Sequence, residues 1–316
     1  MEEKQFYLDE DCVVSAFWGE IGWLLQDSQG YLRYLKFEVY KDKKFFIMTH
    51  KGLFPFLSDF CDYLLPLPEE FYKEGLHGDC YEAVPIDAPP GTLTNPKTYV
   101  ALWEYFRNFY NKEKAIEIKM PRGCNHYIDD SCQQIFANYD LEKIEADTPI
   151  FVVLPRARSR ATNRNVPEYI WKEVIDTLSK DNLVILAGTP DGACLVDYEK
   201  ENIVNLINYK GEDKTVLTMR YLKSAVCSLS SQSGGTHISL LTGCPTYCIG
   251  HERERHAIHS NRLQVPVSFR TVQDYRAIDS ETILTDVANF VQEMYGSDDK
   301  DKILLDSIIE ERLKNA

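Results

Sequence analysis

Residues 226–250 read VCSLSSQSGGTHISLLTGCPTYCIG, and this stretch decides the fold. An apolar run at 226–229 predicts a buried strand, and the small and polar residues at 230–236 predict a tight turn. An apolar helical pattern follows as far as Leu241, and the Gly-Cys-Pro sequence at 243–245 ends it before a second apolar strand. Strand, turn, helix and strand in this order are typical of a parallel α/β sheet.

The turn in this stretch has the composition of an anion-binding site. Gly234 and Gly235 allow close approach of the backbone to an anion, and Ser233 or Thr236 can cap the helix that follows. The unpaired N–H groups and the positive dipole end of a helix start attract phosphate, and His237 can donate to the same phosphate. Two alternatives stay open: a strand-turn-helix corner without a ligand, and a buried histidine with its partners inside the core.

The same alternation continues through the whole second half of the chain. Predicted strands and helices follow one another at 150–155, 167–178, 183–187, 203–207 and 215–225, with a further strand at 265–269 and a helix at 283–294. This order predicts a doubly wound parallel sheet, in which ligands bind at the carboxyl ends of the strands.

The first half reads as a second α/β domain. Strands are predicted at 11–17, 43–50, 63–67 and 117–121, and a glycine-containing turn after the first strand leads into a helix. The aromatic residues of a helix at 99–110 are interpreted as core residues rather than a sugar-stacking surface. We therefore expect one domain at 1–147, a second at 148–290 and a C-terminal helix at 291–316.

Composition excludes several classes of protein. With 49 acidic and 35 basic residues the net charge is -14, which opposes binding to nucleic acids and anionic membranes. The sequence has no apolar run long enough for a transmembrane helix and no signal peptide, so we expect a cytoplasmic protein. Its nine cysteines lack a C-x-x-C pair, which favours reduced, buried thiols and no metal site.

Four arginines follow the predicted strand at 150–155. Arg156, Arg158, Arg160 and Arg164 lie within nine positions of a chain that is acidic elsewhere. Guanidinium groups suit phosphate oxygens and stabilise the negative charge of a departing nucleotide. The alternative is a solvated loop whose arginines pair with surface acids.

Further candidate contacts follow other predicted strands. Gly188 and Thr189 come directly after the strand at 183–187, where a base or ribose would lie. His251 follows the last strand of the opening stretch and is expected to reach the diphosphate or the sugar, and Tyr209 is a candidate for stacking on a base.

Three segments together carry a family resemblance. PRARSRATNRNVPEYIWKEVI at 155–175, LVILAGTPD at 183–191 and SLSSQSGGTHISLLTGCPTYCIG at 228–250 resemble the donor-binding half of the heptosyltransferases, glycosyltransferase family 9. The resemblance covers about residues 148–255. It implies the GT-B fold, in which two Rossmann-like domains face a cleft. The domain at 1–147 would then bind the acceptor, the domain at 148–290 would bind the nucleotide sugar, and the helix at 291–316 would cross back to the first domain.

The resemblance also implies an activity and its residues. That family transfers a sugar from a nucleoside-diphosphate sugar to an acceptor hydroxyl with inversion and without a metal or another cofactor. By position, Glu20 would be the catalytic base and Trp18, Gly19 and Gly22 would belong to the acceptor loop. The transferred group would be a hexose, pentose or heptose, and the acceptor a carbohydrate, a glycan or another hydroxyl compound. The arginine-poor first half argues against a lipopolysaccharide acceptor.

Two other functions fit the same fold. A nucleotide-sugar-binding protein without catalysis would need only the donor site. A sugar-nucleotide epimerase or hydrolase would need an acid-base pair inside the donor pocket.

Overall fold

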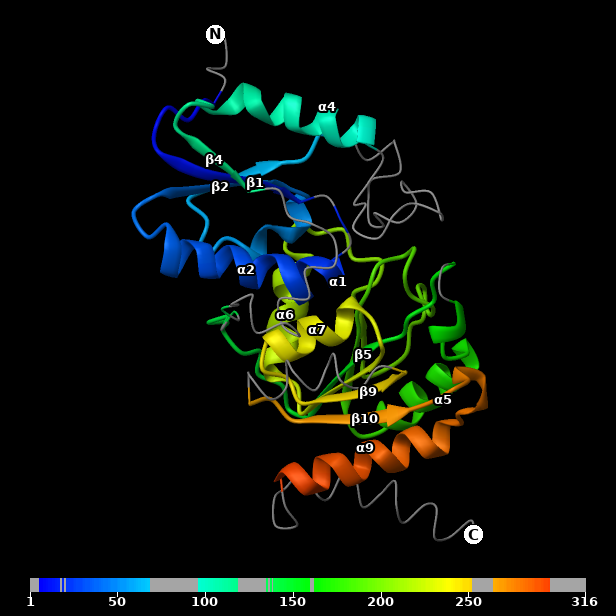
Figure 1. Ribbon diagram of the computed structural model, residues 1–316. Helices are drawn as coiled ribbons and strands as arrows, with labels where there is room; N and C mark the ends of the chain where they lie inside the picture. Colours follow the sequence, from blue (N-terminus) through cyan, green and yellow to red (C-terminus); the bar gives the residue numbers. More distant parts are fainter. Residues whose placement is uncertain are drawn as a thin grey trace, which may run out of the picture. The chain divides into compact units, whose positions relative to one another are not determined.

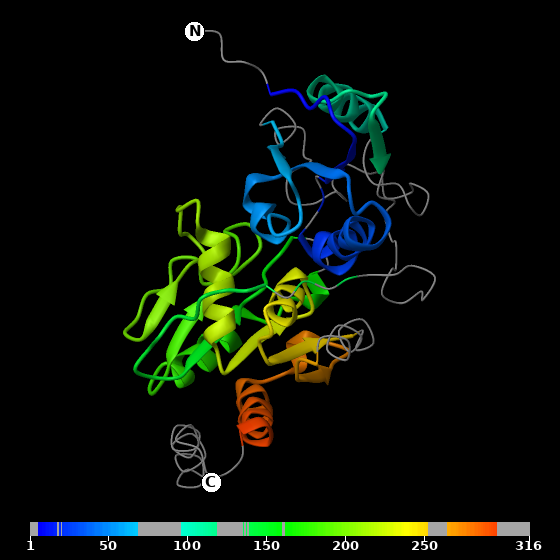
Figure 2. The ribbon, with the colours of Figure 1, turned by 90° about the vertical axis from the view of Figure 1, so that its left-hand side faces the viewer.

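The chain forms two compact units, which we describe separately (Figures 1 and 2). The structure is a computed structural model that describes residues 6–17, 19, 21–68, 96–118, 135, 137, 139–159, 162–251 and 264–295. The first unit comprises residues 1–137 and the second residues 138–316. The predicted boundary between residues 147 and 148 lies further along the chain, just before the first strand of the second unit.

A four-stranded parallel sheet forms the centre of the first unit, with the strand order β3-β2-β1-β4. The strands are β1 (Cys12–Phe17), β2 (Lys44–Thr49), β3 (Tyr63–Pro66) and β4 (Ala115–Ile118). The first three confirm the predicted strands, and β1 is buried along its whole length because it lies inside the sheet. The last strand begins at Ala115, earlier than predicted, and residues 119–121 lie outside the described part.

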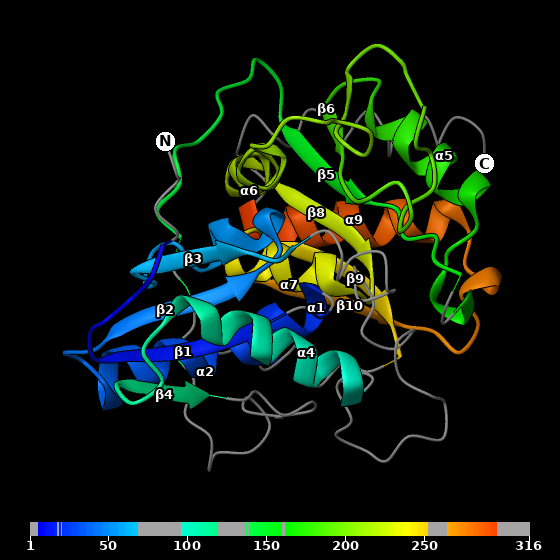
Figure 3. The same cartoon turned by 90° about the horizontal axis from the view of Figure 1, so that it is seen from above.

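Helices cover both faces of this sheet (Figures 1 and 3). One face carries a continuous helical run made of α1 (Ile21–Trp23), the π-helical turn η1 (Leu24–Ser28), α2 (Gln29–Tyr34) and the π-helical turn η2 (Leu35–Val39). The other face carries α4 (Pro96–Phe106), which η5 (Arg107–Phe109) extends. A 3-10 helix, η3 (Lys51–Phe56), connects β2 to β3.

Two aromatic residues of α4 belong to the core, as predicted. Trp103 and Phe106 are buried, and the ring of Phe106 lies 4.9 Å from that of Phe46 on β2 in an edge-to-face contact. Tyr110 packs against the same Phe106 ring at 5.2 Å. These rings therefore stabilise the packing of helix on sheet and do not form a sugar-stacking surface.

The second unit is built on a six-stranded parallel sheet with the order β10-β9-β8-β5-β6-β7. The strands are β5 (Ile150–Leu154), β6 (Leu183–Leu186), β7 (Ile203–Asn205), β8 (Cys227–Ser231), β9 (Thr246–Gly250) and β10 (Val267–Thr271). All neighbouring pairs run parallel, which confirms the predicted doubly wound sheet.

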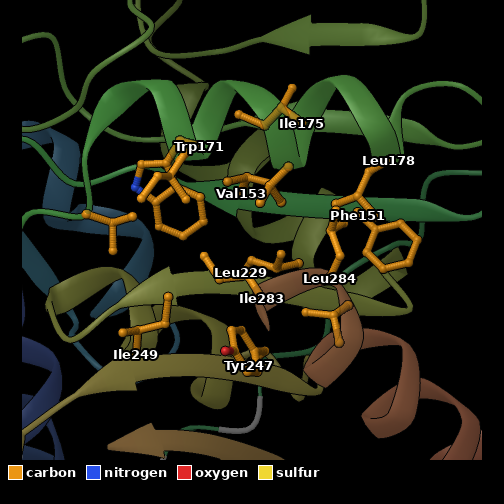
Figure 4. Packing of buried hydrophobic residues seen from close by; sticks show 14 of the residues in the cluster. Phe151, Val153, Trp171, Ile175, Leu178, Leu229, Tyr247, Ile249, Ile283 and Leu284 are labelled. Carbon is orange, nitrogen blue, oxygen red and sulfur yellow. The ribbon is translucent and has the colours of Figure 1, made fainter. Parts of the chain in front are cut away.

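Two layers of helices cover the second sheet. On one face, α5 (Glu168–Leu178) and α9 (Ser280–Tyr295) pack with β5, β8 and β9 in a core that includes Trp171, Tyr247 and Leu284 (Figure 4). On the other face, α6 (Lys214–Ser224) and α7 (Gly234–Leu241) cover the same sheet. The fold is thus held by apolar burial on both faces of a parallel sheet.

Two local predictions need correction. The strand β8 continues through Ser230 and Ser231, which the sequence places in the turn. Both serines are fully buried. The Ser230 hydroxyl is hydrogen-bonded to the Thr236 hydroxyl at 2.8 Å, so the buried end of the strand keeps this polar group satisfied. Pro167, predicted inside the first turn of a helix, is the N-cap of α5, because its extended ψ of 140° precedes the helical residues.

The C-terminal part of the chain is described as far as Tyr295. Residues 291–295 form the end of α9, and Val291 packs in the core of the second unit. The rest of the predicted helix at 291–316 lies outside the described residues. None of the helices in the described part of the chain is long and apolar enough to cross a membrane.

Candidate functional site

The strand order of the second unit defines where a ligand would bind. The chain runs from β5 to β6 and β7 on one side and then crosses to β8, β9 and β10 on the other. Parallel α/β sheets bind ligands at the carboxyl ends of the strands where this direction reverses, which here is between β5 and β8. The loop at 155–165, which carries the four arginines and which we call the arginine loop, follows β5. The Ser-Gly-Gly turn at 233–235 follows β8, so the two predicted groups leave neighbouring strands at the same edge.

Ser233 starts α7 as its N-cap. Its backbone is extended, with φ -163° and ψ -179°, and its Oγ accepts a hydrogen bond from the N–H of Gly235 at 3.2 Å. The first N–H groups of a helix have no acceptor within the helix. The amide of Gly234 therefore lies at the positive end of α7, beside the carboxyl end of β8.

Gly235 brings the start of α7 against β5. A Cβ atom built on Gly235 would lie 2.7 Å from Cδ2 and 3.4 Å from Cβ of Leu154, the last residue of β5. A side chain at this position would force the Leu154 side chain to move, on the strand that leads into the arginine loop. The glycine thus serves a helix-strand contact in addition to the anion approach that the sequence predicts.

The next two residues of α7 point into the protein. The Thr236 hydroxyl lies 2.8 Å from Oγ of Ser230 and 3.6 Å from Sγ of Cys248, and Thr236 is fully buried. His237 is 4% exposed. Thr236 thus links the start of α7 to β8 and β9, and a direct contact of Thr236 or His237 with a donor stays a prediction.

Asn165 holds the beginning of the arginine loop. Its Oδ1 accepts hydrogen bonds from Nη1 of Arg156 and, at 3.2 Å, from the backbone N–H of Arg158. Its Nδ2 donates to the Arg158 carbonyl at 2.9 Å. Arg156 is only 7% exposed, so its guanidinium is a positive charge fixed at the end of β5.

The loop after β6 is joined to the arginine loop. The Ala157 N–H donates to the Gly192 carbonyl, and the Cys194 N–H donates to the Pro155 carbonyl, both at 2.9 Å. The intervening turn is closed by a 3.0 Å bond from Gly192 to the Thr189 carbonyl. The predicted donor residues Gly188 and Thr189 therefore belong to a segment that is hydrogen-bonded to the arginine loop. Gly188 has φ +149°, which a residue with a side chain rarely adopts.

Arg158 and Arg164 lie on the partly exposed part of the arginine loop. Arg164 ends the 3-10 turn η6 (Thr162–Arg164).

His251 follows β9 and lies within reach of the arginine loop. Its Nε2 is 3.4 Å from Nδ2 of Asn163, and its backbone N–H donates to Oε1 of Gln232 at 2.9 Å. Tyr209 is half-exposed, and its hydroxyl donates to Asp213 at 3.0 Å within its own turn. The structure thus brings His251 to Asn163 in the arginine loop, whereas Tyr209 contacts Asp213 in its own loop.

Several predicted residues fall outside the described part: the base Glu20, the acceptor-loop residue Trp18, and Arg160. In the first unit, Gly19 follows the carboxyl end of β1 and Gly22 lies in α1. The order β3-β2-β1-β4 reverses direction between β1 and β4, so Gly19 lies at the ligand-binding edge of its own sheet.

Asn163, Asn165 and Gln232 are polar residues of the site whose contacts the sequence does not predict. Gln232 contacts His251, which lies 19 positions further along the chain, and Asn163 contacts the same His251 across 88 positions. Such contacts leave no periodic signal. Among the described residues no cluster of histidine, cysteine, aspartate and glutamate could hold a metal ion.

The sequence matches no protein-family model and no curated protein. Solved structures, however, match over most of the chain. The E. coli ADP-heptose LPS heptosyltransferase II has a TM-score of 0.59 at 12% identity, over 90% of this chain and 99% of the other. A glycosyltransferase family 9 protein from Veillonella parvula has a TM-score of 0.56 at 12% identity, over 92% and 100%. The E. coli heptosyltransferase WaaC, solved with ADP, has a TM-score of 0.57 at 13% identity, over 88% and 99%.

At these identities the likeness shows the fold. The chain is an α/β protein with two parallel-sheet units of the GT-B type. More particularly, it has a heptosyltransferase-like fold, as the three motifs of its second half predict.

Proposed function

We propose that the protein is a glycosyltransferase that moves a sugar from a nucleoside-diphosphate sugar to an acceptor hydroxyl. One observation carries the proposal: the buried Arg156 and the capped start of α7 follow neighbouring strands at the point where the second sheet reverses direction. A diphosphate needs both positive charge and N–H donors, and this edge supplies both.

The donor would lie with its diphosphate between the arginine loop and α7. The Gly234 amide offers an N–H donor, and the guanidiniums of Arg156, Arg158 and Arg164 offer charged donors. Arg160 belongs to the same loop by sequence. Gly188, Thr189 and His251 border this group through the hydrogen-bonded loops after β6 and β9 and would contact the rest of the nucleotide sugar.

The proposed reaction is a single displacement. The acceptor oxygen attacks the anomeric carbon, the bond from that carbon to the diphosphate oxygen breaks, and the nucleoside diphosphate leaves with the electron pair. The carboxylate of Glu20 takes the acceptor proton, and the arginines stabilise the charge on the leaving group. Inversion, metal independence and the roles of Glu20, Trp18, Gly19 and Gly22 rest on the family resemblance.

A thermal-shift screen tests the donor site. The protein is heated with UDP-, GDP-, ADP-, CMP- and dTDP-sugars, because a ligand that binds only the folded state raises the melting temperature. We expect one nucleoside-diphosphate sugar to raise it and the CMP-sugar, which has a single phosphate, to raise it less. If none of the five raises it at millimolar concentration, the proposed donor site is wrong.

Replacement of Glu20 by Gln tests catalysis separately. The variant is expected to keep donor affinity and to lose about 100-fold or more of the transfer rate, since general-base catalysis contributes on that order. Retention of the wild-type transfer rate in Glu20→Gln would remove Glu20 as the base while leaving the donor site intact.

A further inference from the structure

A polar network joins three loops at the carboxyl edge of the second sheet. Its centre is His251, directly after β9. Gln232 after β8, Asn163 in the arginine loop and Tyr275 in η7 (Tyr275–Ala277) contact it. We call these four residues the histidine clasp.

Gln232 fixes the backbone of His251. Its Oε1 accepts from the His251 N–H at 2.9 Å, and its own N–H donates to the Ile249 carbonyl at 2.8 Å. Gly250 provides the space for this side chain, because a Cβ atom there would lie 2.8 Å from Oε1 of Gln232 and 2.6 Å from the ring of Phe269. Gln232 is 4% exposed, so burial holds its side-chain amide in this position.

Two contacts orient the His251 ring. The ring of Tyr275 lies 4.9 Å away at 73°, an edge-to-face arrangement that holds the imidazole plane. Nε2 then lies 3.4 Å from Nδ2 of Asn163, where a neutral imidazole nitrogen can accept from the amide. Tyr275 is fully buried, whereas Asn163 is exposed.

The contact between His251 and Asn163 passes over a strand. His251 follows β9 and Asn163 belongs to the loop after β5, but β8 lies between these two strands. The start of α7 follows β8, so the clasp connects the two loops on either side of the helix start. Asn165 holds the first part of the arginine loop, and Asn163 is the described side chain that ties its second part to β9.

We propose that Asn163 and Gln232 are positioning residues that act through His251 to hold the arginine loop beside the start of α7. Neither needs to touch the donor. This role rests on the proposed function. The two residues would hold the guanidiniums in place before the donor binds, so less conformational entropy of the loop is lost when the diphosphate binds.

Asn163→Ala is the principal variant, with Asn289→Ala as its control. Asn163 is exposed, so its removal is expected to leave the melting temperature unchanged. Asn289 is an exposed asparagine in the middle of α9, in the same unit but in another element. Asn163→Gln keeps the amide and is expected to restore part of any loss.

Hydrogen exchange on the ligand-free protein measures the loop itself. The N–H groups of Arg158 and Asn165 donate to Oδ1 of Asn165 and to the Thr162 carbonyl, respectively. In Asn163→Ala we expect both to exchange about tenfold faster, since a local opening becomes more frequent, while Asn289→Ala leaves them unchanged. Unchanged exchange in Asn163→Ala would overturn the clasp.

Calorimetric titration with ADP, GDP, UDP and pyrophosphate measures the consequence. Asn163→Ala and Gln232→Leu are each expected to weaken the tightest of these probes about tenfold, and Asn163→Gln less. Faster exchange with unchanged affinity would overturn the positioning role. If the wild-type protein binds none of the four probes, the proposed function fails with this role, and the exchange result still decides whether the clasp exists.

Discussion

Asn165 makes three contacts with the arginine loop through one side chain. Its Oδ1 accepts from the Arg156 guanidinium and the Arg158 N–H, and its Nδ2 donates to the Arg158 carbonyl. An amide suits this place because it presents a donor and an acceptor in one plane. The position of a buried positive charge thus depends on a neutral neighbour.

Replacement of Asn165 separates loop geometry from charge. Asn165→Ala removes all three bonds and is expected to lower the free energy of unfolding by about 1–3 kcal/mol and to weaken diphosphate binding. Asn165→Asp keeps the acceptor and pairs with Arg156, but it turns a carboxylate oxygen toward the Arg158 carbonyl, so we expect a smaller loss of stability than in Asn165→Ala together with a lower anion affinity. Chemical denaturation and calorimetry measure the two effects. Equal diphosphate affinity in wild type and both variants would show that the Arg156 end of the loop does not face the ligand.

At the scale of an element, the helix α7 is predicted from its local sequence, and its start forms part of the candidate donor site. Ser233 caps the helix, and Gly235 allows its first turn to lie against Leu154 of β5. The cap satisfies one of the amides at the helix start, and the remaining dipole end lies at the carboxyl edge of the sheet.

Two substitutions of Ser233 distinguish capping from anion binding. Ser233→Ala loses the cap, so we expect a loss of about 1 kcal/mol in stability. Ser233→Asp keeps a good cap and favours the helix dipole, but it adds a negative charge where the diphosphate is proposed. We therefore expect near wild-type stability with diphosphate affinity reduced at least about tenfold. A Ser233→Asp protein that binds diphosphate as well as wild type would contradict the proposed place of the anion.

The sequence predicts this element well and its surroundings less well. The apolar runs, the glycine pair and the Gly-Cys-Pro stop mark the strand, turn and helix at 226–250, because each depends on local backbone preference. The strand nevertheless continues through Ser231. The hydroxyl of Ser230 is hydrogen-bonded to Thr236 in α7, a contact that the pattern of the strand itself does not show. The second role of Gly235, contact with Leu154, is set by a strand distant in the sequence.

At the scale of the whole molecule, one charged group ties the last elements of the second unit together. Asp286 on α9 accepts from the Tyr247 hydroxyl at 2.8 Å and forms two bonds of 2.5 Å with Arg270. These residues come from β9, β10 and α9. Burial, followed by the nearby Asp286 carboxylate, raises the pKa of the Tyr247 phenol above its ordinary value near 10.

This shift predicts a loss of stability at high pH. The folded state keeps the Tyr247 proton, whereas the unfolded chain releases it above about pH 10, so the free energy of unfolding falls as the pH rises beyond that value. Tyr247→Phe has no such proton and should show a shallower decline between pH 9 and about 11. Denaturant unfolding across this range measures the slopes, with the exposed Tyr169→Phe as control. Identical slopes for wild type and Tyr247→Phe would rule out this contribution.

The sequence predicts the architecture of the whole molecule where the apolar residues repeat with the period of a strand or a helix. Alternating apolar strands and helices predict the parallel sheet of the second unit, the family resemblance implies the parallel sheet of the first, and the strand order places the arginines and α7 at one edge. The side chains that organise that edge come from long-range contacts, such as Asn163 with His251 and Gln232 with His251. A single sequence carries no local pattern for such pairs. The predicted base Glu20 lies outside the described residues and stays a prediction.

The most direct test is an experimental structure of the protein with the nucleoside diphosphate that binds most tightly. The account predicts a diphosphate within hydrogen-bond distance of the Gly234 amide and of at least one guanidinium of the arginine loop. A nucleotide bound elsewhere, or one that contacts the loop without the start of α7, would contradict it.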